Sequence, residues 1–122
     1  MAVEYTYDSQ NHLILLSCLG RVTVEERITC VTHMLADSNL PDKAPILIDV
    51  NDAINFPSSS EVIEIANLLA ELRSRFRQKI AILNAKAGHV TISHVIALSA
   101  ETGDSQVRVF FSQEEALQWL HI

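Results

Sequence analysis

Polar side chains follow two apolar segments that have the character of buried strands, and these side chains are the best placed to do chemistry. Asp49, Asn51 and Asp52 lie at the end of the first segment, and Asn84 and Lys86 follow the second. In open α/β sheets, ligands bind at the edge where the carboxyl ends of the strands meet. Asp49 and Lys86 are of types that make an acid/base pair. Polar residues are also expected in any loop at this edge, so we interpret the set as a ligand or partner surface and predict no catalytic residue.

A serine pair lies close to this edge in the sequence. Ser58 stands three residues before Glu61, which is the spacing of a capping box, in which the two side chains satisfy free backbone N–H groups at the start of a helix. The remaining N–H groups at such a helix start, together with the helix dipole, favour an anion. We therefore include Ser58 and Ser59 in the predicted surface, beside the polar loop expected at Asn51–Pro57.

The sequence lacks the motifs of several common reaction types. It has no G-x-S-x-G nucleophile motif, and its three glycines are too few and too scattered for a phosphate-binding loop. Its five histidines fall on different predicted elements, without the H-E-x-x-H spacing of a zinc site. We expect no metal centre, no cofactor and no enzyme activity.

Length and composition predict one domain over residues 1–122. Fifteen acidic residues outnumber nine basic ones, so the mean field is negative and repels phosphate backbones and anionic lipids. The N-terminus lacks a signal-peptide pattern, and no apolar run approaches the ~18 residues of a membrane span. We predict a cytoplasmic protein that binds no nucleic acid and does not insert into a membrane.

The two cysteines lie on separate predicted elements. Cys18 falls in an apolar strand segment and Cys30 in a helix, without the close pairing of a redox or zinc motif. We predict that both are reduced residues in or near the core and that no disulfide joins them.

Hydrophobic patterns predict the elements that must position these side chains, in the order β-β-α-β-α-β-α-β-α. Short alternating or apolar runs predict the strands, at Val3–Tyr7, Leu13–Leu19, Pro45–Val50, Ile80–Leu83 and Val107–Phe111. Capping spacing predicts three helix starts, at Thr23, Ser58 and Ser112, and apolar spacing predicts a further helix over Val90–Glu101.

Each helix should bury one stripe of apolar residues. In the first helix the predicted stripe is Val24, Ile28, Val31 and Leu35. The long helix after Ser58 has the strongest stripe, formed by Val62, Ile65, Ala66, Leu69, Leu72 and Phe76.

Strands that alternate with helices predict right-handed crossovers. We expect an α/β fold with a five-stranded mixed, mostly parallel sheet, four helices and the first strand as an antiparallel edge. Apolar residues occupy both faces of the predicted strands, so helices, or helices and a partner subunit, must cover both faces. Ile63 and Leu68 add apolar surface to the long helix outside its stripe, which favours a homodimer.

Three segments resemble the SpoIIAA-like branch of the STAS (anti-sigma factor antagonist) superfamily. They are Gly20–Thr23 after the hairpin, Ile48–Ala53, and the strand Val107–Phe110 that leads into the Glu-Glu-Ala-Leu-Gln-Trp-Leu run at 114–120. The resemblance spans nearly the whole chain. The sequence is similar to small bacterial proteins of that branch. It implies a SpoIIAA-like domain.

The resemblance also implies a phosphorylation site. Anti-sigma factor antagonists carry Asp-Ser-Ser-Gly after the third strand, and the first serine is phosphorylated by a partner kinase. That motif falls on residues 57–60, where Ser58 matches the serine, while Pro57 replaces the aspartate and Ser60 replaces the glycine. Ser58 is thus a possible phosphosite as well as a helix cap.

Three functions remain open from the sequence. The first is a non-catalytic regulatory or interaction module with an unidentified protein partner, which would bind through the Asn51–Ser60 loop and the following helix. The second is a carrier of a small apolar or lipid-like ligand, since the superfamily resembles the CRAL-TRIO fold and the Val90–Leu98 segment is apolar around much of its circumference. The third is an unrecognised enzyme that uses Asp49 or Asp52.

Overall fold

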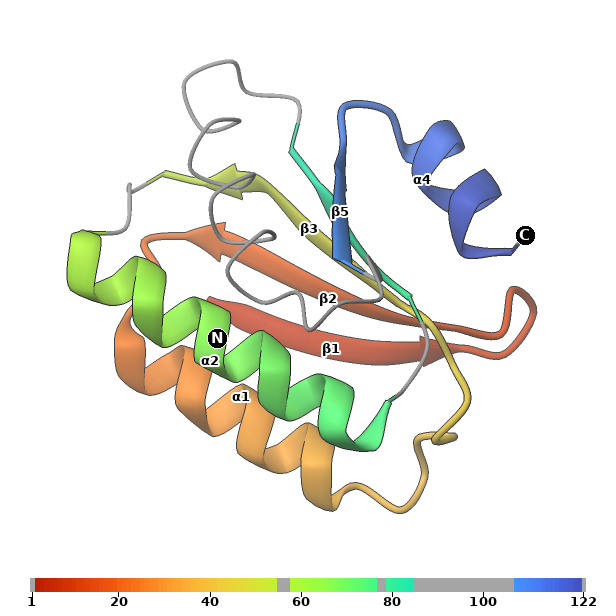
Figure 1. Ribbon diagram of the computed structural model, residues 1–122, viewed down its shortest axis with the longest axis horizontal. Helices are drawn as coiled ribbons and strands as arrows, with labels where there is room; N and C mark the ends of the chain where they lie inside the picture. Colours follow the sequence, from red (N-terminus) through yellow and green to blue (C-terminus); the bar gives the residue numbers. More distant parts are fainter. Residues whose placement is uncertain (1, 55–57, 77–78, 85–106, 122) are drawn as a thin grey trace.

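The structure, a computed structural model, describes residues 2–54, 58–76, 79–84 and 107–121. This part of the chain forms five strands and three helices around one sheet (Figure 1). In chain order the elements are β1 Val3–Asp8, β2 Leu13–Gly20, α1 Val24–Ala36, β3 Ile46–Ala53, α2 Ser59–Arg75, β4 Ile80–Leu83, β5 Val107–Phe110 and α4 Gln113–Leu120. The helix predicted over Val90–Glu101 lies outside the described residues. The described residues therefore contain three helices, and the predicted count of four is not supported.

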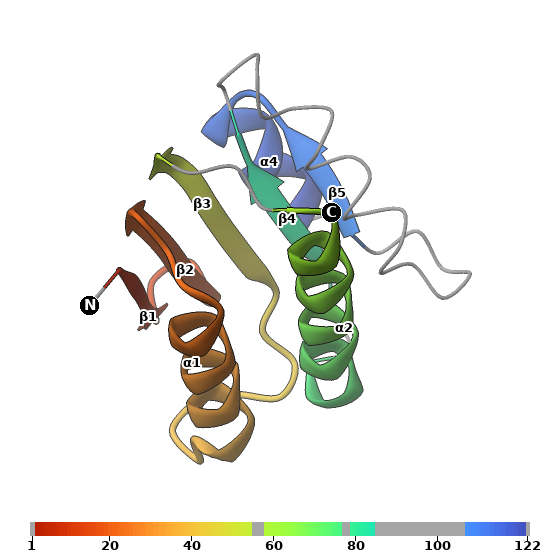
Figure 2. The same ribbon diagram turned by 90° about the vertical axis from the view of Figure 1, so that its left-hand side faces the viewer.

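The strand order in the sheet is β1-β2-β3-β4-β5. β1 pairs antiparallel with β2, and the other neighbours pair in parallel, which confirms the predicted mixed, mostly parallel sheet with β1 at an edge. From β2 onward the strands follow one another across the sheet in a single direction. Right-handed crossovers then bring successive helices to the same face, and α1 and α2 indeed lie together on one side (Figure 2).

Two hydrophobic cores lie on the two faces of the sheet. The larger is between the sheet and the α1–α2 pair, and Ile14, Ile46 and Phe76 have no solvent exposure there. The smaller packs α4 through Ala116 against the other face, where Leu47 is buried. Alternate residues of each strand therefore point into different cores.

The predicted helix starts are confirmed. Thr23 caps α1 with a complete capping box to Glu26, and Ser58 caps α2 with the same arrangement. At α4 the Ser112 side chain accepts a hydrogen bond from the Glu115 backbone N–H. These bonds form within four residues, so a local spacing rule is sufficient to find them.

The stripe predicted for α1 is wrong in part. Cys30, Val31 and Met34 are the buried residues of this helix, whereas Ile28 is 44% exposed. The first turn of the helix contacts the residue before β1, because the Glu26 carboxylate accepts a hydrogen bond from the backbone N–H of Ala2 at 3.1 Å. The Cys30–Met34 arc of the helix faces the core, and Ile28 lies outside it.

The predicted strand at Pro45–Val50 is displaced as well. β3 begins at Ile46 and continues to Ala53, so Asn51 and Asp52 belong to the strand and not to a loop after it. Pairing with β2 explains the extension, because Leu19 lies opposite Asp52 and Gly20 opposite Ala53. The residues Asn51 and Asp52 are polar, so no apolar pattern in the sequence indicates that the strand continues through them.

Candidate functional site

A β-bulge shapes the end of β3, where three of the predicted site residues lie. Between the pairs Ser17–Asp49 and Leu19–Asp52, β3 advances by three residues while β2 advances by two. The Asp49 carboxylate accepts a hydrogen bond at 2.9 Å from the backbone N–H of Asn51 across this irregularity. Bulges re-aim the side chains that follow them and are frequent beside functional sites. Here the bulge places Asp52, in place of Asn51, opposite Leu19.

The remaining predicted residues of this edge differ in their surroundings. Asn84 follows β4, its backbone N–H donates to the Phe110 carbonyl at 2.9 Å, and the residue is 1% exposed. Asn84 therefore contributes almost no accessible area to this edge. Lys86 lies outside the described residues, so its suggested pairing with Asp49 stays a prediction.

Ser58 is a helix cap in the structure. Its Oγ accepts from the Glu61 backbone N–H at 3.3 Å, and the Glu61 carboxylate accepts from the Ser58 backbone N–H at 3.3 Å and from its hydroxyl at 3.1 Å. Ser58, Ser59 and Ser60 are all exposed. The cap prediction is confirmed, while the phosphosite stays a prediction, and Pro57 of the motif lies outside the described residues.

An arginine links this cap to the neighbouring helix. Arg27 of α1 donates to Glu61 at 2.7 Å and to Glu64 at 2.8 and 3.1 Å, and its side chain is only 12% exposed. The hydrogen bond from Arg27, followed by those from Ser58, lowers the pKa of the Glu61 carboxyl. Sequence reasoning missed this cluster, because Arg27 is 34 residues from Glu61 and no local pattern connects them.

Two exposed apolar side chains lie at the same end of the sheet. Leu19 at the end of β2 is 43% exposed, and Ile54, directly after β3, is 63% exposed. The Ile54 backbone N–H donates to the Gly20 carbonyl at 2.9 Å, which holds the two chain segments together. An isoleucine close to the polar residues Asn51 and Asp52 is the signal in the sequence for this feature.

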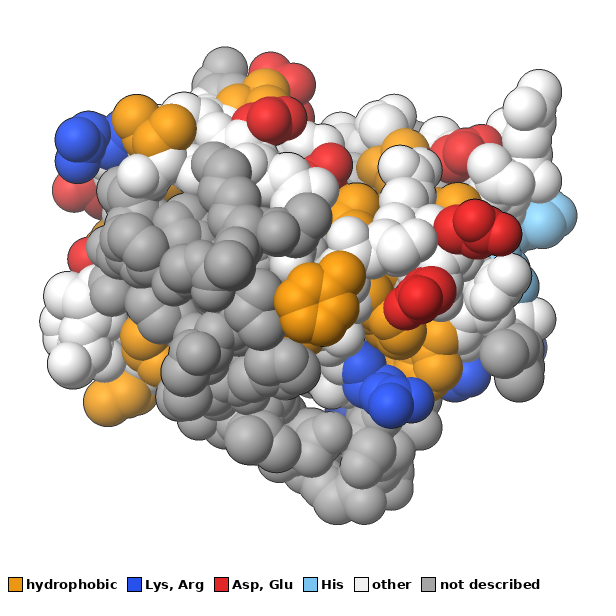
Figure 3. Space-filling view, turned by 90° about the horizontal axis from the view of Figure 1, so that it is seen from above, with side chains coloured by type: hydrophobic (Ala, Val, Ile, Leu, Met, Phe, Trp, Pro, Cys, Tyr) orange, Lys and Arg blue, Asp and Glu red, His pale blue; other side chains and the backbone are white. Residues whose placement is uncertain are grey.

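We call the exposed residues at this end of the sheet and at the start of α2 the edge surface, and define it by Leu19, Asp52, Ile54, Ser58 and Ser59. Only four peptide steps separate Ile54 from Ser58, so their Cα atoms are at most about 14 Å apart. Leu19 lies opposite Asp52 in the sheet. Figure 3 views the whole molecule from above, and acidic, basic and hydrophobic side chains are interspersed on that side. Within the edge surface, Leu19 and Ile54 supply exposed apolar area and Asp52 supplies an exposed carboxylate.

The described residues offer few groups suited to covalent or metal chemistry. Cys18 and Cys30 are free thiols, and burial raises the pKa of Cys18 to about 12 and that of Cys30 to about 11, so both remain protonated at neutral pH. Within the same ranges no three His, Cys, Asp or Glu side chains come close enough to hold a metal ion. Each helix of the described segments is also too short or too polar to span a bilayer.

Comparisons with known proteins agree with this architecture. By sequence, no protein-family model and no curated protein matches the chain. By structure, it is similar to an uncharacterised protein of the DUF3478 family with a SpoIIAA-like fold from Shewanella loihica, with a TM-score of 0.63, 15% identity, and 98% of this chain and 92% of that chain covered. It is also similar to an anti-sigma-factor antagonist (STAS) domain protein from Planctomyces limnophilus, with a TM-score of 0.61, 15% identity and 98% of both chains covered. The chain therefore has the SpoIIAA-like fold of STAS domains.

Proposed function

We propose that this protein is a non-catalytic regulatory module that binds a protein partner through the edge surface. The observation that carries the proposal is the exposure of Leu19 and Ile54, at 43% and 63%, at the strand end where Leu19 pairs with Asp52. A SpoIIAA-like fold, shared with an anti-sigma-factor antagonist domain protein, is consistent with an interaction role.

The energetics favour covering these side chains. Full burial of a leucine or isoleucine side chain stabilises by about 1.5–3 kcal/mol. Leu19 and Ile54 together expose about as much as one complete side chain, so a partner that covers both gains roughly 1.5–3 kcal/mol from them. Asp52 at their side adds charge, which selects a partner with a basic or hydrogen-bond-donating counterpart.

We further propose Ser58 as the regulated position of the edge surface. Its hydroxyl is exposed, and it lies at a helix N-terminus whose free N–H groups favour a phosphate. A phosphate there would replace the capping hydroxyl and lie next to the Glu61 carboxylate, which the hydroxyl now contacts at 3.1 Å. Repulsion between the two would favour Glu61 turning toward Arg27, which it already contacts at 2.7 Å, and would change the charge that the partner meets.

The partner surface can be tested with matched charge insertions. Leu19→Glu and Ile54→Glu should abolish capture of the partner from the source cell by purified protein, while their melting temperatures stay close to that of the wild type. Ile28→Glu is the control, because Ile28 is similarly exposed, at 44%, but lies on α1. Equal capture by all three variants and the wild type would place the partner site elsewhere.

The regulated position is tested by Ser58→Asp and Ser58→Ala. Loss of an N-cap side chain costs about 1 kcal/mol, so the alanine variant should be less stable but should still bind. The aspartate variant should keep its stability, because aspartate is itself a good cap, and should lose binding. If neither variant changes binding, Ser58 acts as a helix cap alone.

The ligand-carrier alternative rests on the Val90–Leu98 segment, which lies outside the described residues, and it stays a prediction. A native mass spectrum of the purified protein separates the two ideas. A retained apolar ligand would favour the carrier, whereas an unliganded mass together with loss of partner capture in the edge variants would favour the interaction module.

A further inference from the structure

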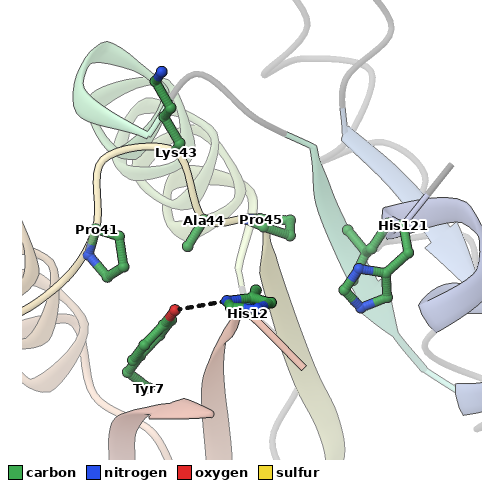
Figure 4. Close-up of a pocket in the computed structure, with 8 residues that line it drawn as sticks. Tyr7, His12, Pro41, Lys43, Ala44, Pro45 and His121 are labelled. Atoms are coloured by element: carbon green, nitrogen blue, oxygen red, sulfur yellow. Dashed lines mark hydrogen bonds between the residues drawn. The ribbon is translucent and has the colours of Figure 1, made fainter. Parts of the chain in front are cut away.

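A cavity of about 330 Å³ lies at the opposite end of the sheet from the edge surface. Figure 4 shows the residues that line it. It forms where the β1–β2 turn, the loop before β3 and the end of α4 come together. Six residue steps along β2 separate Ile14 from Gly20, so roughly 20 Å separates the two ends. The proposed partner surface does not use this cavity.

The polar side chains that line the cavity can all donate hydrogen bonds, and one of them, Lys43, is a cation. They are the Tyr7 hydroxyl, the imidazoles of His12 and His121, and the Lys43 ammonium, and two prolines, an alanine and a leucine complete the lining. No carboxylate side chain is among the lining residues.

The acidic residues nearest in sequence are engaged by other groups. Asp8 accepts hydrogen bonds from the backbone N–H groups of Gln10 and Asn11 and from the Asn11 amide. Hydrogen bonds from Asn11, chiefly, and the nearby His12 lower the pKa of the Asp8 carboxyl, so Asp8 acts electrostatically on one histidine of the cavity. Asp42, by contrast, pairs with Arg75 at 2.7 Å.

His12 breaks a local rule at this place. Its φ is +52°, and among the described residues it is the single non-glycine residue with a positive φ. Glycine or asparagine is the usual choice in this conformation, and strained residues concentrate at functional positions. The Tyr7 hydroxyl lies 3.4 Å from His12 Nδ1 and orients the imidazole, which leaves Nε2 for another partner (Figure 4).

We propose that this cavity binds a small anion of the phosphate or phosphomonoester class. His12 and His121 would donate directly to its oxygens, while the Tyr7 hydroxyl holds the His12 imidazole in place. The Lys43 ammonium is directed away from Tyr7 and His12 in Figure 4, and its flexible four-carbon stem allows it to turn toward a bound anion. The cavity volume is near the lower end of the range for ligand pockets, which suits a small metabolite.

Inorganic phosphate is the probe for the test. Backbone amide NMR spectra are recorded during titration with sodium phosphate at constant pH and ionic strength, with sodium chloride as the reference salt. The expected result is a saturable shift confined to amides around Tyr7, His12, Ala44 and Leu120. His121→Gln and Lys43→Gln should each weaken phosphate roughly three-fold or more, and the double variant roughly ten-fold or more, which corresponds to about 1.4 kcal/mol.

Two control variants keep the result interpretable. His33→Gln, on the exposed side of α1, removes an imidazole away from the cavity and should leave the phosphate affinity unchanged. Ile54→Glu should also leave it unchanged, because that residue belongs to the edge surface, so this inference and the proposed function can fail separately. Shifts that do not saturate, that chloride reproduces, or that persist with equal affinity in the double variant would overturn the proposal.

Discussion

Replacing Arg27 by methionine removes the cation that joins α1 to α2. Arg27 donates to both Glu61 and Glu64, at 2.7 and 2.8 Å. The Arg27 side chain is 12% exposed and that of Glu64 is 20% exposed, and Glu64 Oε2 is buried without a hydrogen-bond partner within the described ranges. Methionine retains an unbranched apolar stem, so the substitution removes charge and hydrogen bonds while it preserves much of the packing.

The magnitude follows from the burial of the pair. Breaking a fully buried ion pair by removing one partner costs about 3–5 kcal/mol, and an exposed pair contributes at most about 1 kcal/mol. The Glu64 side chain is 20% exposed, so the pair lies between these two limits. We therefore expect Arg27→Met to lower the free energy of unfolding by about 2–3 kcal/mol at pH 7. Arg27→Met combined with Glu64→Gln should recover part of the loss, since the uncompensated carboxylate is then absent.

The effect should also depend on pH. Arg27 and Ser58 lower the pKa of Glu61 in the folded state. A carboxyl with a lowered folded pKa stabilises the fold above its unfolded pKa, about 4.3 for glutamate, and that contribution is lost as the pH falls through the folded value. The gap in stability between wild type and Arg27→Met should therefore be largest near neutral pH and should narrow as the pH falls below about 4.

Urea unfolding monitored by circular dichroism at pH 7 and at pH 3.5 measures both effects. Arg21→Met, at an exposed position just before α1, is the matched control and should change stability by less than about 0.5 kcal/mol. If Arg27→Met falls within the same limit at pH 7, the ion pair is screened by solvent and does not hold the helices together.

Three further predictions follow from individual residues. Gly20→Ala should cost about 1–2 kcal/mol in urea unfolding, because Gly20 has a φ of +65° at the end of β2, and Gly20→Asn should cost less. Cys18 and Cys30 should resist a thiol reagent in native protein at pH 8, because their pKa values are raised to about 12 and about 11, and should react fully in urea. Ile63 is 65% exposed while Leu68 packs against the core, so if a homodimer forms, Ile63→Glu should dissociate it in light scattering whereas Ile28→Glu should not.

Local chemistry determined where the helices of the described residues begin. The Thr23–Glu26 and Ser58–Glu61 capping boxes close hydrogen bonds within four residues, so spacing alone located both helices. The apolar run at Ile80–Leu83 predicted β4 with its observed bounds, because a strand covered on both faces needs no polar alternation. The fold class and the mixed sheet followed from the alternation of such segments.

Contacts between distant segments decided the rest. β3 extends to Ala53 through a bulge that needs β2 beside it, and the rotation of α1 that exposes Ile28 accompanies a contact of Glu26 with Ala2. Arg27 meets a glutamate 37 residues away, and three separate parts of the chain surround the cavity at the amino end of the sheet. A spacing rule can predict hydrogen bonds between residues three or four positions apart. The features named here depend on packing between segments that are distant in the sequence, so the pattern of one segment cannot predict them.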